Sequence, residues 1–147
     1  MTYSDYISSL REKRINRMFL NSDSEKRKSV YRELLQCANK KLRFFAGNLC
    51  DDITNSDDFV EGISDFIEKN GSLEILLNKY NASLIKESNL YKRLAFYAAR
   101  NYNVTVKSTP VTVNIHLNGK DTPAHFAVAD FYAFRLEVDI EKRTAIC

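Results

Sequence analysis

The sequence has no apolar run approaching the length needed to cross a lipid bilayer, and its first stretch, MTYSDYISSLREKRINR, is polar and charged. A secretory signal would instead show a short basic stretch followed by an apolar core. The three cysteines, Cys37, Cys50 and Cys147, lie far apart and form no CxxC pair, which favours reduced thiols over disulfides. We therefore expect a cytoplasmic protein with no membrane contact.

Metal ligands are also scarce. Zinc sites need closely spaced cysteines or several histidines. This chain offers only scattered cysteines and two histidines, His116 and His125. We expect no bound metal and no cofactor.

The 147 residues include 44% hydrophobic and 28% charged side chains, values typical of one globular domain with its own core. The net charge of +3 conceals an uneven distribution. Lys and Arg predominate in residues 1–43 and 75–120, whereas Asp and Glu predominate in 51–74 and 121–147. Such blocks are typical of solvated helix faces, but they also suit a basic surface that meets phosphates or complementary patches in an oligomer.

Residues 1–41 carry apolar side chains at helical spacing between charges and are expected to form a basic helical arm. Ser22 and Glu25 have the spacing of a capping box and open the second helix of this arm, over about 24–41. The arm offers charge without a base-reading motif, so any nucleic-acid binding by it should be sequence-independent. Its candidate nucleic-acid-binding residues are Arg11, Lys13, Arg14, Arg17, Lys26, Arg27, Lys28 and Arg32.

Residues 42–147 are expected to form an α/β body. Short apolar runs predict strands, and stretches with helical periodicity separate them, which implies parallel pairing with right-handed crossovers. Further on, VTVNIHLN alternates cleanly, Asn118-Gly119 signals a turn, and HFAVAD and AFRLEV follow as strands. The fold class is therefore α/β, a mixed sheet with flanking helices. The predicted elements of the parallel part are strands 42–50, 72–78 and 103–109 and helices 55–70 and 86–101.

This order of elements and the segment AHFAVAD…AFRLE resemble one repeat of the phospholipase D-like proteins, over roughly residues 40–140. The resemblance implies a motif HxKxxxxD, present once in each of two repeats or subunits. In that chemistry one histidine attacks a phosphodiester, the partner histidine protonates the leaving oxygen, and the lysines hold the phosphate. A single repeat also implies a homodimer, because its relatives bury a sheet edge or face against a second copy.

The motif is degenerate in both possible registers. Counted forward from His125, the lysine and aspartate positions hold Ala127 and Tyr132. Counted back from Asp130, the histidine position holds Pro123 and the lysine position holds His125. We prefer the second register, because Asp130 precedes a turn and a second strand as in the family's hairpin. In that register the nucleophile is missing, and Asp130 serves as a turn former.

His125 is nevertheless the candidate catalytic residue, because it lies where the family places its chemistry. The alternative is a histidine at a strand start whose ring bonds to neighbouring backbone. Lys107, Lys120 and Arg135 are candidates to surround a phosphate or other anion. Alternatively, Arg135 and Glu137, which share a strand face, pair with each other.

The sequence therefore predicts a catalytically degenerate phospholipase D-like module that acts by binding, as a homodimer with a nucleic-acid or protein partner. One alternative is an active, metal-independent phosphodiesterase or nuclease whose dimer shares a site containing two copies of His125. Another is a purely structural docking subunit. The missing motif lysine argues against the enzyme, and the basic arm favours binding over docking.

Overall fold

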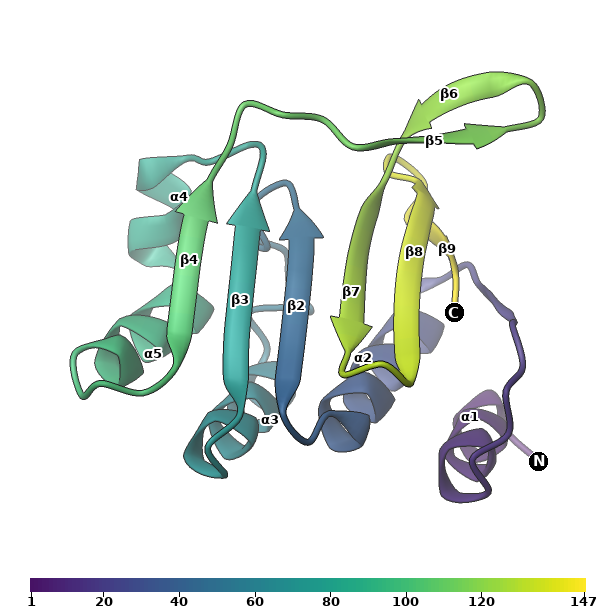
Figure 1. Cartoon of the computed structure of the whole chain (residues 1–147), viewed down its shortest axis with the longest axis horizontal. Helices are drawn as coiled ribbons and strands as arrows, with labels where there is room; N and C mark the ends of the chain where they lie inside the picture. Colours follow the sequence, from purple (N-terminus) through teal and green to yellow (C-terminus); the bar gives the residue numbers. More distant parts are fainter.

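A computed structural model describes all 147 residues and shows an α/β fold. The main sheet has seven strands in the order β1-β9-β8-β7-β2-β3-β4, and β5 and β6 form a separate hairpin (Figure 1). This confirms the predicted mixed sheet with flanking helices. The helices are α1 (Tyr3–Glu12), α2 (Ser24–Cys37), α3 (Asp57–Glu68), α4 (Ala82–Glu87) and α5 (Asn89–Ala98). The strands are β1 (Leu20–Asn21), β2 (Lys41–Ala46), β3 (Ser72–Leu77), β4 (Val104–Ser108), β5 (Asn114–Leu117), β6 (Lys120–Pro123), β7 (His125–Ala129), β8 (Ala133–Asp139) and β9 (Thr144–Ile146).

Strands β2, β3 and β4 pair in parallel, as the sequence predicts, with α3 and then α4 and α5 as the crossovers. Ser56 caps α3 by accepting a hydrogen bond from the backbone N–H of Phe59, and acidic residues fill the first turn of this helix. The apolar stripe of α3 packs on the sheet, where Phe44 of β2 lies opposite Ile75 of β3. Burial of this stripe forms the centre of the core.

The other half of the main sheet is antiparallel. β7 pairs with β2 and with β8, which gives the hairpin predicted around Asp130. β9 and the two-residue strand β1 complete this side. Helix α2 packs beneath β7 and β8 through Val30, Tyr31 and Leu34, so the N-terminal segment shares the core of the body. The domain division predicted at residue 41 remains a prediction.

The helices cover only one face of the main sheet (Figure 1). On the other, uncovered face, one register row crosses the sheet from β1 to β4 and is apolar until its last residue. We call it the apolar row, and its exposed members include Leu20 and Leu76. In strand order it consists of Leu20, Ile146, Leu136, Phe126, Phe45 and Leu76, and it ends at Lys107.

Asp130 joins the β7–β8 turn to the start of β2. Its φ is 49°, a left-handed conformation that Asp tolerates better than most residues. Its carboxylate accepts hydrogen bonds from the backbone N–H groups of Asn39, Lys40 and Lys41 at 2.7, 2.9 and 2.7 Å. Partial burial opposes ionisation of Asp130, but these three donors outweigh it and hold its pKa below the ordinary value.

Replacing Asp130 with Asn should destabilise the fold by about 1.5–3 kcal/mol, the usual contribution of hydrogen bonds to a charged group. Asn tolerates the same backbone conformation, so the loss of stability measures the contribution of the Asp130 carboxylate. Because the folded pKa of Asp130 is depressed, its contribution should be present above about pH 4 and lost as the pH falls further. Urea denaturation at pH 7 and pH 3 measures both effects. Asp121→Asn, on the exposed β5–β6 hairpin, is the control, and equal midpoints for the two variants at pH 7 would contradict the expectation.

Candidate anion-binding pocket

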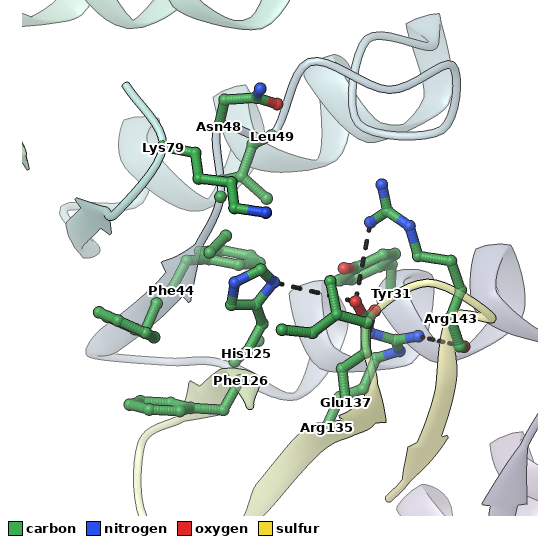
Figure 2. Close-up of a pocket in the computed structure, with 15 residues that line it drawn as sticks. Tyr31, Phe44, Asn48, Leu49, Lys79, His125, Phe126, Arg135, Glu137 and Arg143 are labelled. Atoms are coloured by element: carbon green, nitrogen blue, oxygen red, sulfur yellow. Dashed lines mark hydrogen bonds and ion pairs between the residues drawn. The ribbon is translucent and has the colours of Figure 1, made fainter. Parts of the chain in front are cut away.

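A pocket of about 160 Å³ lies at the carboxyl ends of β2 and β3, beside the first residue of β7. Carboxyl ends of neighbouring parallel strands are the usual position of ligand sites in open α/β sheets. Figure 2 shows the Lys79 side chain entering from beyond the end of β3, with His125 between it and Glu137. Arg143 approaches from the opposite side.

His125 is buried, with 9% of its surface exposed, and lies opposite Glu137 in the β7–β8 register. Its Nδ1 is 3.9 Å from Glu137 Oε1, beyond hydrogen-bonding distance, and its Nε2 is buried without a hydrogen-bond partner. Burial lowers the pKa of His125; Glu137 opposes this shift, whereas Arg143 and Lys79 add to it. His125 is therefore a neutral imidazole at neutral pH, and one of its ring nitrogens is buried without a hydrogen-bond partner.

Arg135 supports Glu137 from within the sheet. Its Nη1 donates to Glu137 Oε2 at 2.7 Å, its Nε donates to Asn21 Oδ1 at 2.9 Å, and its Nη2 donates to the Arg143 carbonyl at 3.2 Å. The guanidinium also faces the Tyr31 ring, 5.3 Å from its centroid. Every nitrogen of this guanidinium is engaged, which fits the predicted Arg135–Glu137 pair and makes Arg135 a support of the site.

Two further cations reach the pocket. Lys79 lies two residues after the end of β3, and its backbone N–H donates to the Gly47 carbonyl at 3.0 Å, which fixes it beside the end of β2. Nη1 of Arg143 lies 3.5 Å from Asp51 Oδ2 and 3.9 Å from Glu137 Oε1. The charges around the pocket comprise the cations Lys79, Arg27, Arg135 and Arg143 and the carboxylates Asp51 and Glu137. The surroundings are therefore net positive, and they favour an anion.

The backbone is strained at two residues that line the pocket. Leu49 and Arg143 have φ values of 55° and 58°, in the left-handed region that residues other than Gly, Asn and Asp rarely adopt. Such residues cost about 1–3 kcal/mol each and cluster at functional sites. Their position supports the view that the pocket geometry serves binding.

The structure brings together only part of the predicted site. His125 and Arg135 line the pocket, but Lys107 is exposed on the edge strand β4, separated from β8 by three intervening strands. Lys120 is exposed on the separate β5–β6 hairpin. These two lysines therefore do not surround the same site as Arg135. His116, on β5, is exposed as expected, and its Nδ1 lies 3.0 Å from Asp121 Oδ1.

The sequence reasoning missed Lys79, Glu137 and Arg143 as pocket residues. A signal existed for Lys79, because it directly follows a predicted strand in the parallel part of the sheet. Glu137 was identified only as a partner of Arg135. Nothing in the sequence marks Arg143, which reaches the pocket from the turn before β9.

Most of the predicted basic residues of the arm have acidic neighbours. Arg27 requires a correction, because only 8% of its surface is exposed and its Nη1 lies 3.7 Å from Asp51; it does not belong to an exposed cationic surface. Lys13, Arg14 and Arg17 are exposed and have no acidic side chain within ion-pair distance. In the remaining pairs Arg11 and Arg32 face Glu33, Lys26 faces Asp23, and Lys28 faces Glu25.

No family model matches the chain, and no curated protein matches it. Among solved structures, the chain is similar to TrmBL2, an archaeal chromatin protein whose structure shows a novel mode of DNA binding. The TM-score is 0.57 and the sequence identity 13%, and the match covers 97% of this chain and 49% of TrmBL2. The likeness establishes the fold, over about half the length of TrmBL2.

None of the five helices is both long and apolar enough to cross a membrane. No group of three or more His, Cys, Asp or Glu side chains is arranged to hold a metal ion.

The chain has two histidines, so NMR can follow both imidazoles as the pH changes. We expect His125 to titrate below about pH 6.5, the ordinary value, because burial disfavours its charged form. Removing the nearby positive charge with Arg143→Gln should raise the pKa of His125, whereas Lys142→Gln should leave it unchanged. Since the unfolded state takes up this proton more readily, protonation below about pH 6.5 should also reduce stability. A His125 signal that titrates above this value would contradict the expectation, and His116→Ala assigns the two signals.

Proposed function

We propose that this chain is a nucleic-acid-binding module of the phospholipase D-like type that binds a phosphate group without hydrolysing it. The observation that carries the proposal is the buried His125, whose Nε2 has no hydrogen-bond partner, in a pocket that the cations Lys79 and Arg143 also line. A buried polar nitrogen without a partner is rare in folded proteins, and a bound group accounts for it.

Phosphate oxygens match this arrangement. They accept hydrogen bonds from ammonium, guanidinium and neutral imidazole groups, and the net positive surroundings favour their charge. A pocket of about 160 Å³ has room for a few water-sized groups and not for a nucleotide. The pocket therefore suits one phosphate of a nucleic-acid backbone or end.

The fold likeness adds support. TrmBL2 is a chromatin protein whose structure shows a novel mode of DNA binding, and its fold covers nearly all of this chain. The sequence identity is too low to transfer residues. The free cations Lys13, Arg14 and Arg17 of the arm can supply further, sequence-independent phosphate contacts.

Hydrolysis of a phosphodiester needs catalytic groups that this pocket lacks. The phosphohistidine route requires a second imidazole to protonate the leaving group, and His116 does not line the pocket. The lysine position of the motif is occupied by His125 itself. Losing one preorganised charge-stabilising group typically costs about a hundred- to a thousandfold in rate.

A homodimer through the uncovered face of the sheet is the second part of the proposal. A sheet face crossed by an apolar row is ordinarily covered by another layer, and a second copy offers the same row. His125 shares the helix-covered face with Ala127, which belongs to the core. This dimer would therefore place two sheets, about 10 Å apart, between the two pockets, which argues against a shared catalytic site.

Lys79→Gln should weaken binding to DNA and reduce the dependence of log affinity on log salt by about one, because it removes one phosphate contact. Lys86→Gln on α4 is the matched control, since Lys86 is exposed and does not line the pocket. Fluorescence anisotropy with single- and double-stranded DNA over a salt series measures the affinity and its salt dependence for each variant.

The same DNA, incubated without metal, should remain intact at background rate. Turnover that His125→Ala abolishes would contradict the binding-only proposal and favour the phosphodiesterase. Equal affinities for Lys79→Gln and Lys86→Gln would exclude Lys79 from phosphate binding.

Leu76→Lys should convert the proposed dimer to a monomer at micromolar concentration, because it places a charge in the apolar row. Leu84→Lys, at a similarly exposed position on α4, should leave the dimer intact. Sedimentation velocity distinguishes the two states. A wild-type chain that sediments as a monomer would remove the self-association part of the proposal and leave the pocket unaffected.

A further inference from the structure

The β7–β8 turn presents two aromatic rings to solvent at the end of the molecule opposite the pocket. Phe131 is 96% exposed and Tyr132 is 75% exposed. Turn positions of this kind are ordinarily filled by Gly, Asn, Asp, Ser or Pro, and Asp130 already supplies the backbone conformation that the turn needs. The fold gives no reason for two exposed aromatic rings at this turn.

The amino ends of the parallel strands lie at the same end of the molecule, and a continuous set of backbone hydrogen bonds links them to the turn. The Asp130 N–H donates to the Lys41 carbonyl, the Ser72 N–H to the Lys40 carbonyl, and the Leu73 N–H to the Asn103 carbonyl, each at 2.8 Å. Three strand spacings separate β7 from β4, which is roughly 14 Å. The turn therefore lies at one end of the short sheet edge that the amino ends of β2, β3 and β4 form.

Exposed cations without acidic partners line this edge. Lys40 precedes β2, Lys69 precedes β3, and Arg100 precedes β4, and none of them has an acidic side chain within ion-pair distance. Two acids at this end are engaged elsewhere, because Asp130 bonds to backbone and Glu68 accepts from the Tyr97 hydroxyl, whereas Asp65, one helical turn before Lys69, is exposed and forms no ion pair.

Cations near helix C-termini also complement the helix dipole, so these cations alone would carry no inference. The exposed rings are the second observation. Aromatic rings beside a line of free cations match the chemistry of single-stranded nucleic acid, whose bases stack on rings while its phosphates meet the cations. A duplex hides its base faces in its own stack, so it offers these rings much less.

We propose that Phe131 and Tyr132 are a base-stacking site for single-stranded nucleic acid, with Lys40 and Lys69 contacting its phosphates. This inference rests on the proposed nucleic-acid binding, and it adds the class of ligand and a second contact surface. The site and the pocket lie at opposite ends of β2, so they can be changed independently.

The test uses a labelled pyrimidine-rich DNA single strand, the matching duplex, and the full chain. Phe131→Ala and Tyr132→Ala should each weaken binding of the single strand by roughly five- to a hundredfold, the usual effect of removing a stacking ring. Binding of the duplex should change much less. Phe131→Tyr should retain affinity for the single strand, and Tyr80→Ala, an exposed aromatic at the other end of the sheet, is the matched control.

Phe131→Leu separates stacking from simple apolar contact, because leucine keeps the apolar surface and loses the ring face. Reduced binding by Phe131→Leu supports the proposal, whereas retained binding overturns it. Vesicles of anionic phospholipid that bind the wild-type chain and the Phe131→Leu variant equally, but not Phe131→Ala, would assign the turn to a membrane surface and also overturn it.

The two proposals fail in different ways. If Lys79→Gln weakens binding and the variants at Phe131 and Tyr132 do not, the pocket stands and the stacking site is wrong. If the wild-type chain binds neither single-stranded nor double-stranded DNA, the proposed function itself is wrong.

Discussion

Strand β2 pairs in parallel with β3 on one side and antiparallel with β7 on the other, and the Asp130 carboxylate fixes the start of this three-strand unit by accepting three backbone N–H groups. A register slip of one residue would turn every side chain of a strand to the opposite face. The pairing therefore determines which side chains reach the core and which reach the uncovered face. It also places His125 at the carboxyl end of β2 and the aromatic turn at its amino end.

The charges around the pocket are costly to bury. Glu137 is 2% exposed, and its Oε1 has no hydrogen bond, although His125 Nδ1 and Arg143 Nη1 are each 3.9 Å away. Well-packed apolar residues would often give equal or greater stability than a buried ion pair. Retention of this incompletely satisfied network, together with the strained backbone of Leu49 and Arg143, favours a role in binding over a role in folding.

The sequence predicts the elements well because their signals are local. The helical periodicity before Asn70, the strand pattern around Ile75 and the turn at Asp130 each arise within a few residues. The pocket could be predicted only at His125 and Arg135, because its other side chains come from segments that meet only after folding. Arg27 shows the limit most clearly: on a helical wheel it is one more surface cation, and only the tertiary contact with Asp51 explains its burial.

The three surfaces proposed to bind a phosphate, a base and a second copy occupy separate parts of the molecule. The pocket and the aromatic turn occupy opposite ends of the strands, and the apolar row crosses the face between them. A dimer formed through the apolar row leaves both ends of each copy free. Two linked copies that bind the same strand gain affinity by raising the effective concentration of the second contact, without any new interaction. On the proposed function, weak contacts at one phosphate pocket and one stacking site per chain would suffice for attachment to a long nucleic acid, and the proposed self-association would contribute to binding.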